Sequence, residues 1–193
     1  MGLLTLEHGK LAYRADFLLY ALSVPALTAL LLWTAARSYW LNGLFWVLVG
    51  LVSWTLIEYV LHGFVLHGLQ PFRGWHEAHH QRPTALICAP TIFSATLIAV
   101  LVFLPAWVIG DLSCACSLTL GLLVGYLAYA TTHHATHHWR ATSSWLKARK
   151  RWHALHHHAH DPACYGVTSA FWDHVFGSGS LCAAPHRRST GTL

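Results

Sequence analysis

The chain alternates between long apolar stretches and short polar segments that are rich in histidine. Each of four apolar stretches is long enough, or nearly so, to cross a bilayer as a helix, which takes about 20 residues. These stretches cover residues 17–36, 44–62, 86–110 and 112–132. Pro25 and Pro90 fall within two of them, and bundled membrane helices tolerate proline. The pattern predicts an all-α integral membrane protein with four transmembrane helices and a polar tail over residues 133–193.

The composition agrees with a single membrane-embedded domain over residues 1–193. Hydrophobic residues make up 55% of the chain and charged residues only 10%, against about 25% charged residues in ordinary soluble domains. A length of 193 residues suits one domain. The five cysteines include no CxxC pair, and their odd number predicts that they form no disulfide framework.

Basic residues are distributed unequally between the two ends of the predicted helices. Eleven of the twelve Lys and Arg residues lie at the end that carries both termini, and only Arg37 lies at the opposite end. Because cytoplasmic segments carry the excess of Lys and Arg, both termini are expected in the cytoplasm. We expect a multi-pass protein of the bacterial inner membrane. The net charge of +5 is then explained by the membrane surface, and no nucleic-acid partner is expected.

Fourteen of the seventeen histidines form four clusters. The clusters read HGFVLH (62–67), HEAHH (76–80), HHATHH (133–138) and HALHHHAH (153–160). On the predicted topology all four lie at the cytoplasmic side, because two complete crossings separate the second cluster from the third. The topology was derived without using the histidines, so their common location is an independent observation.

The spacing of the histidines selects those that can share a metal ion. Imidazole is the commonest protein ligand of metals, and residues three or four apart lie on one face of a helix. The HxxHH pattern of 76–80 recurs at 153–157, and His133 and His137 are four apart. His62 and His67 are five apart, about 140° around a regular helix, so they converge only if the helix end departs from regular geometry.

This selection gives ten candidate ligands: His62, His67, His76, His79, His80, His133, His137, His153, His156 and His157. One tetrahedral site uses about four, so ten predict two ions held close together in a cytoplasmic histidine-rich cap. For any one cluster, ordinary interfacial histidines are an equal alternative. Four clusters at one membrane face favour a metal centre.

Two further polar residues precede a histidine cluster by about one helical turn. Glu58 lies four residues before His62, and Tyr129 lies four residues before His133. An acid within a membrane helix is a candidate functional residue, and Glu58 is placed to orient His62. The alternative for Glu58 is an ion pair with an arginine of the tail. Both residues are candidate catalytic positions that act through the histidines.

The histidine clusters and the segments around them resemble a known family. The sequences EYVLHGFVLH (58–67), HEAHH, HHATHH, HALHH (153–157) and YGVTSAFWDHVFG (165–177) are similar to the fatty acid hydroxylase/sterol desaturase superfamily of membrane di-iron oxygenases. The resemblance covers roughly residues 54–178. Its last segment is closest to the fatty acid 2-hydroxylase branch.

The resemblance implies an enzyme that uses O2 and two iron ions to hydroxylate a lipid acyl chain. Zinc is expected to substitute for iron on purification. It also implies that the ten selected histidines are the ligands, that the substrate is a lipid or fatty acyl chain, and that electrons come from a separate redox partner, cytochrome b5-like or ferredoxin-like.

Alternatives of three kinds remain open at this point. A carotenoid ring hydroxylase has four similar histidine clusters, although its tail usually lacks the GVTSAFWDHVFG segment. A sterol-type desaturase uses the same metal chemistry. A metal transporter or sensor is a non-enzymatic reading, but transporters place their ligands near the bilayer midplane, whereas these clusters line one face.

Overall fold

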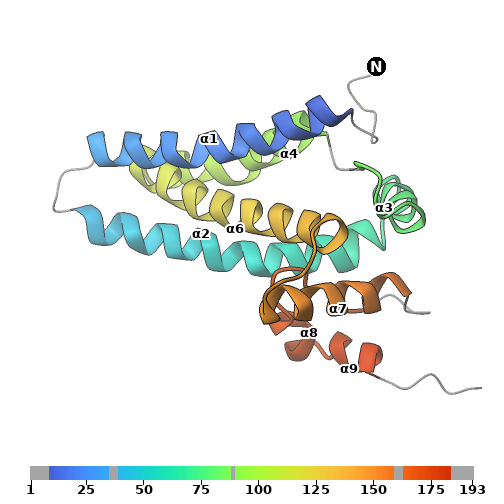
Figure 1. Cartoon of the computed structure of the whole chain (residues 1–193). Helices are drawn as coiled ribbons and strands as arrows, with labels where there is room; N and C mark the ends of the chain where they lie inside the picture. Colours follow the sequence, from blue (N-terminus) through green and yellow to red (C-terminus); the bar gives the residue numbers. More distant parts are fainter. Residues whose placement is uncertain (1–8, 35–38, 88–89, 159–162, 184–193) are drawn as a thin grey trace, which may run out of the picture.

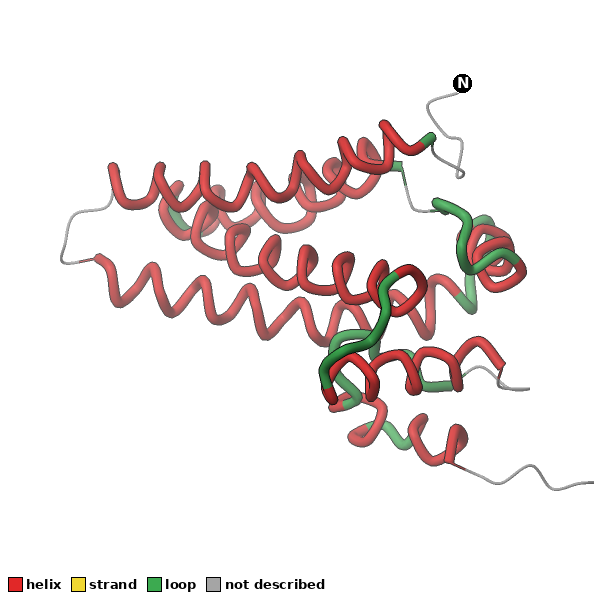
Figure 2. Tube along the Cα trace, viewed as in Figure 1, coloured by secondary structure: helices red, strands yellow, loops and turns green. Residues whose placement is uncertain are grey.

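The computed structural model describes residues 9–34, 39–87, 90–158 and 163–183. Helices joined by loops make up this part of the chain (Figure 2). Four helices are long and apolar enough to cross a membrane. They are α1 (Lys10–Thr34), α2 (Trp40–Val60) continued by the π-helical turn η2 (Leu61–Leu66), α4 (Thr91–Ile98) continued by the π-helical segment η3 (Ala99–Phe103) and α5 (Leu104–Ile109), and α6 (Leu112–His138).

The membrane-crossing helices differ from the hydropathy-based prediction at several boundaries. The first begins at Lys10, the second extends from Trp40 to Leu66, and the third begins at Thr91. The fourth continues to His138, so the third histidine cluster is helical. Hydropathy marks where a helix crosses hydrocarbon, whereas backbone hydrogen bonding continues the helix into polar surroundings. The later start of α4 has a local cause, because Pro90 disfavours helical geometry in the residue before it.

Helix α6 is the central helix of the bundle. Half of its membrane-crossing window is buried within the protein, whereas none of the window of α4–α5 is. Asp111 begins the helix by accepting a hydrogen bond from the Cys114 backbone N–H (2.7 Å), as N-cap residues do. A Cβ at Gly121 would lie only 1.9 Å from the Val47 carbonyl oxygen, so glycine lets α2 and α6 approach closely.

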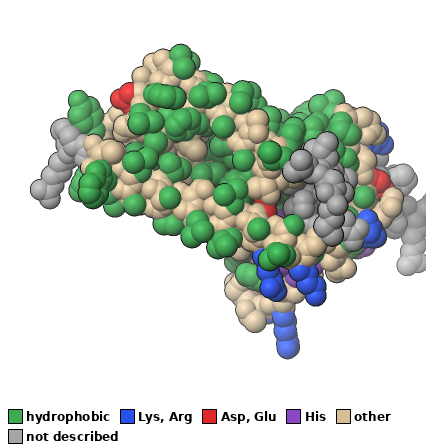
Figure 3. All heavy atoms as spheres, turned by 90° about the horizontal axis from the view of Figure 1, so that it is seen from above, with side chains coloured by type: hydrophobic (Ala, Val, Ile, Leu, Met, Phe, Trp, Pro, Cys, Tyr) green, Lys and Arg blue, Asp and Glu red, His purple; other side chains and the backbone are tan. Residues whose placement is uncertain are grey.

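The remaining helices form a cap at one end of the bundle (Figure 1). They are α3 (Phe72–Gln81), α7 (Ser144–His158), α8 (Phe171–Val175) and α9 (Ser178–Ala183). Figure 3 shows hydrophobic side chains along the bundle and Lys and Arg side chains gathered toward the cap. This distribution fits a lipid-facing bundle whose cap meets the polar membrane surface.

The disulfide state of Cys164 departs from the expectation drawn from the odd number of cysteines. Cys164 is disulfide-bonded, whereas Cys114 and Cys116 are free thiols. An odd number leaves at least one thiol unpaired but does not prevent a single bond, and which cysteines pair depends on which segments meet in the fold.

Candidate metal centre

A change of helix type brings the first two candidate histidines together. Residues Leu61–Leu66 form a π-helix, in which hydrogen bonds run from residue i to i+5 and which recurs at functional sites. The ring centroids of His62 and His67 are therefore 5.5 Å apart, although the same spacing on a regular helix would separate them by about 140°. The structure thus meets the condition that the sequence set for these two residues.

Two groups of four histidines are arranged so that each could hold a metal ion. In each group, one ring nitrogen from every histidine lies within 4.8 Å of the others. The first group is His62, His67, His76 and His156, and the second is His79, His133, His137 and His153. Helix α3 contributes one histidine to each group, and so does helix α7. Each HxxHH pattern is thus divided between the two groups.

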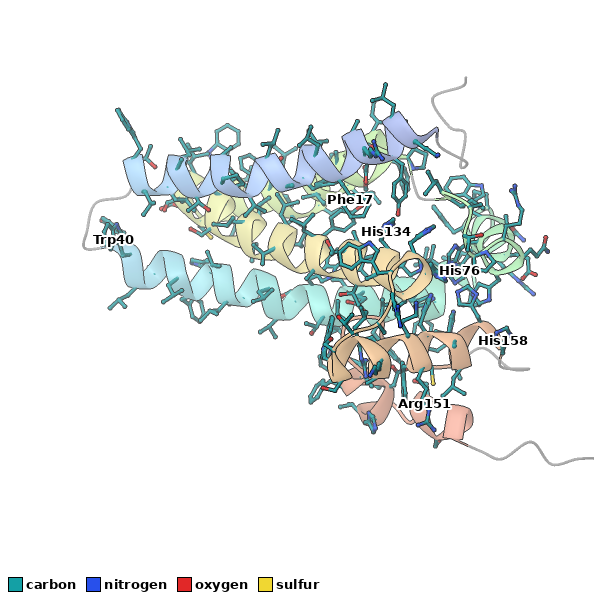
Figure 4. The ribbon with its side chains drawn as sticks, viewed as in Figure 1. Phe17, Trp40, His76, His134, Arg151 and His158 are labelled. Carbon is teal, nitrogen blue, oxygen red and sulfur yellow. The ribbon has the colours of Figure 1, made fainter. Side chains whose placement is uncertain are left out.

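The last two of the ten candidates lie against these groups. His80 Nε2 is 3.0 Å from Nε2 of both His76 and His156 in the first group. His157 Nε2 is 3.1 Å from His153 Nε2 in the second. The rings of His80 and His157 stack on each other with centroids 4.1 Å apart. The structure therefore brings all ten histidines together at the cap end, around His76 in Figure 4.

The donor set fits cations better than it fits a network of hydrogen bonds. His76 Nε2 lies within 3.1 Å of Nε2 of both His62 and His80, and a neutral ring carries only one N–H. Both ring nitrogens of His79 are buried without a hydrogen-bond partner among the described residues. Facing lone pairs and orphaned buried nitrogens are satisfied when metal ions lie between the rings.

Burial keeps these imidazoles in the form that binds metal. Burial and neighbouring imidazoles lower the pKa of His79 and His157 to about 3, and burial lowers the pKa of His67 to about 4. Metal binding needs the neutral ring. All three side chains are consequently neutral at pH 7.

Backbone carbonyl groups orient two of the rings. His62 Nδ1 donates a hydrogen bond to the Tyr165 carbonyl oxygen (2.5 Å), and His156 Nδ1 donates one to the Ala163 carbonyl oxygen (2.7 Å). With the proton on Nδ1, the lone pair of each ring lies on Nε2, which faces the other histidines. Metal-ligating histidines are oriented in this way in proteins generally.

Glu58 is buried, and the hydrogen bonds of its carboxylate go to Val167 and Thr168 rather than to His62. Its Oε1 accepts hydrogen bonds from the backbone N–H of Val167 (2.7 Å) and Thr168 (2.9 Å), and its Oε2 accepts one from the Thr168 hydroxyl (2.5 Å). Among the described residues, no ion pair joins this carboxylate to an arginine of the tail, although Arg149 interacts with it electrostatically. Glu58 instead holds the segment whose Tyr165 carbonyl group orients His62.

Asp173 is a further buried acid at the site, and it is not among the residues that the sequence patterns selected. Its side chain is fully buried. It accepts hydrogen bonds from the backbone N–H of Tyr165 (2.8 Å) and Gly166 (2.9 Å) and from the side chains of Trp152 (3.1 Å) and Ser178 (2.8 Å). The available signal was the motif YGVTSAFWDHVFG itself, which joins the acid and the segment it holds.

Tyr129 lies next to the second group, as its spacing suggested. Its ring stacks on that of His133, with centroids 5.8 Å apart and planes 6° from parallel. The contact limits rotation of a candidate ligand ring.

Other histidines of the clusters face away from the two groups. His134 shares a hydrogen bond with the Tyr13 hydroxyl (3.1 Å). Its ring lies edge-on to that of Phe17, between α1 and α6 (Figure 4). His138 stacks on His134, and His158 is exposed at the end of α7. The candidate ligands and the adjacent histidines in the sequence therefore lie on different faces of the same helices.

Fold and site together define a helical membrane protein with a histidine cluster beneath a polar cap. The chain belongs to the fatty acid hydroxylase family, because a sequence model of that family, described as "Fatty acid hydroxylase", matches residues 47–178. The resemblance found in the histidine motifs is thereby confirmed.

Curated relatives with which the chain aligns are named as fatty acid or fatty acyl hydroxylases. It is 34% identical to the dihydroceramide fatty acyl 2-hydroxylase FAH1 of Arabidopsis thaliana, over 73% of this chain and 63% of that protein. It is 31% identical to the ceramide very long chain fatty acid hydroxylase scs7 of Schizosaccharomyces pombe, over 68% of this chain and 41% of that protein. The chain thus spans less than two thirds of the length of these relatives.

A solved structure shares the fold. The structure described as full length scs7p, with only the hydroxylase domain visible, superposes with a TM-score of 0.74 at 26% sequence identity. The superposition covers 86% of this chain and 66% of that chain.

Proposed function

We propose that this protein is an O2-dependent hydroxylase of lipid acyl chains that holds two metal ions, iron in the active enzyme, within one domain. The observation that carries the proposal is the convergence of ten histidines, eight of them in two groups of four, in a member of the fatty acid hydroxylase family. The first group would hold one ion and the second group the other, with His80 and His157 completing the ligand set. When bound, the two iron ions supply the O2 activation that side chains alone cannot perform.

The protein's own residues hold and shield this centre. Buried neutral histidines provide the ligand nitrogens, the carbonyl groups of Ala163 and Tyr165 fix two rings, and the cap covers the end of the bundle. An acyl chain would approach from the bilayer along the lipid-facing helices. From the names of the relatives we propose C2 of a fatty acyl chain as the reacting position. One atom of O2 enters the C–H bond. Two electrons from a separate redox partner, cytochrome b5-like or ferredoxin-like, and two protons from solvent reduce the other atom to water.

The location of the histidines favours this enzyme over a transporter. Both groups lie at one end of the described bundle, whereas transporters bind their substrates near the membrane midplane.

Cells that express the protein together with a redox partner should accumulate 2-hydroxy fatty acyl lipids. Lipid mass spectrometry should detect a gain of one oxygen atom, located at C2 by fragmentation. His76→Ala should abolish this hydroxylation, because His76 is a candidate ligand in the first group. A loss of two hydrogens would instead indicate a desaturase, and altered carotenoids a ring hydroxylase. An unchanged lipid profile in cells that express the unmutated protein and the redox partner would contradict the proposal.

We also propose that both termini and the cap face the cytoplasm, in a bacterial inner membrane. The support is the eleven-to-one distribution of Lys and Arg between the two ends, because positively charged segments stay on the cytoplasmic side.

Labelling of intact cells with a membrane-impermeant thiol reagent should therefore modify Cys114, at the end of α6 remote from the cap. In a Cys114→Ser background, Thr142→Cys places a thiol at an exposed cap position. This thiol should react only after the membrane is permeabilised. Labelling of Thr142→Cys in intact cells would show that the topology is the reverse of the proposed one.

A further inference from the structure

Within the described part of the chain, residues 163–170, here called the anchor loop, hydrogen-bond histidines of the first group and none of the second. We infer that this loop, held by Glu58 and Asp173, positions the ligands of the first group and leaves the second group unaffected, so that the two metal positions differ in what stabilises them. The inference rests on the proposed metal centre. It assigns Glu58 and Asp173 as positioning residues, neither of which reaches a ligand directly.

The contacts between the loop and the histidines are made by backbone carbonyl groups. Tyr165 accepts from His62 Nδ1 at 2.5 Å, and Ala163 accepts from His156 Nδ1 at 2.7 Å. Both histidines belong to the first group, and both are buried. The loop thus fixes the tautomer and the rotation of two of the four rings in that group.

The loop is itself fixed by two buried carboxylates, one from a residue that precedes it in the sequence and one from a residue that follows it. Glu58 on α2 accepts three hydrogen bonds from Val167 and Thr168. Asp173 on α8 accepts from the backbone N–H of Tyr165 and Gly166. A Cβ at Gly166 would lie 1.9 Å from the Ser169 carbonyl oxygen, so the turn is closed too tightly for a side chain there. The carbonyl groups that meet His62 and His156 are therefore held at fixed positions.

The second group shows no equivalent support within the part of the chain that the structure describes. The Nδ1 atoms of His79 and His153 are buried and have no hydrogen-bond partner there. His133 is stacked on Tyr129, and this ring contact is not a hydrogen bond to an imidazole nitrogen. Because an acceptor on the outer ring nitrogen raises ligand basicity and limits ring rotation, only the first group depends on the loop.

Two substitutions at the carboxylates separate hydrogen bonding from packing. Each oxygen of Asp173 accepts from a ring or backbone N–H, so Asp173→Asn sets an NH2 group against a donor. In Glu58 one oxygen takes both backbone N–H groups and the other takes a hydroxyl. Glu58→Gln can therefore keep all three contacts if the Thr168 hydroxyl accepts, whereas Glu58→Ala removes them. Asp111→Asn is the matched control, because Asp111 is an exposed carboxylate that caps α6 at the end remote from the histidines, and asparagine also caps helices well.

The test is titration of purified, metal-stripped protein in nanodiscs with Co²⁺, followed by visible absorption and by elemental analysis. Wild type and Asp111→Asn should bind two ions per chain. Glu58→Ala and Asp173→Asn should keep one site and weaken the other by about 10–100-fold, the usual cost of losing such a partner. Glu58→Gln should restore two sites. Adding His133→Ala to Glu58→Ala should weaken the remaining site.

The outcomes separate this inference from the proposed function. A wild-type protein that binds no metal would overturn the proposed centre itself. Two ions in wild type, with both sites weakened equally or neither weakened in Glu58→Ala and Asp173→Asn, would overturn only the role of the anchor loop. If those variants do not fold, Thr168→Val, which removes only the hydroxyl contact with Glu58, should weaken one site by a smaller factor, and an unchanged titration would contradict the inference.

Discussion

His156→Ala is expected to be inactive as a hydroxylase, whereas His158→Ala should keep most of its activity. His156 belongs to the first histidine group, donates to the Ala163 carbonyl oxygen, and places its Nε2 3.0 Å from His80 Nε2 and 3.2 Å from His67 Nε2. His158 is exposed at the end of the same helix. Removing a ligand opens the coordination sphere, and O2 activation needs both ions in fixed geometry.

The measurement is product formed per folded protein, with folding checked by size-exclusion chromatography in detergent. The two variants remove the same side chain from positions two residues apart, so a general effect on the helix would appear in both. Equal loss in both variants, or an active His156→Ala, would show that the HxxHH spacing does not define the ligands.

Metal-free protein should lose stability steeply as the pH falls from about 6.5 toward 4. The pKa of His67 is lowered to about 4, and the pKa values of His79 and His157 to about 3, chiefly by burial. The same side chains titrate near 6.5 when unfolded. Between these values the unfolded state binds more protons than the folded state, so acid favours unfolding. The contribution is fully present above the unfolded pKa and is lost as the pH falls.

Thermal unfolding of chelator-treated protein at pH 7.5, 6.5, 5.5 and 4.5 measures this effect. Each additional proton bound on unfolding lowers the free energy of unfolding by about 1.4 kcal/mol per pH unit, which corresponds to a fall in Tm of several degrees. Metal-loaded protein is the control, because bound metal competes with protons and should move the loss to lower pH. An unfolding temperature that does not change between pH 6.5 and 4.5 would mean that these histidines are as accessible to protons in the folded state as in the unfolded one.

The membrane bundle could be predicted from hydropathy alone, and only its boundaries could not. The stretch 112–132 marks the fourth helix correctly, but the helix continues to His138. Apolar composition reports the hydrocarbon crossing, while the last turns are held by backbone hydrogen bonds that composition does not reveal. The family could also be predicted, because it is carried by short local motifs.

Eight of the ten candidate ligands follow helical spacing, and the structure places all ten together, although their role as ligands stays a prediction. Spacing did not show how they divide. His76 and His79 share one HxxHH pattern yet join different groups, as do His156 and His153. The division depends on which ring from another helix each side chain meets, and the spacing within one helix does not contain that information.

The sequence by itself determined that four apolar helices and four histidine clusters lie along this chain, and which histidines share a helical face. The tertiary structure alone decided that Glu58 meets Thr168, 110 residues away, and not His62, four residues away. Local periodicity fixes the direction of a side chain about its own helix axis. A buried carboxylate, however, bonds whichever donors the folded chain brings to it, because leaving it unpaired costs more free energy than any local preference supplies.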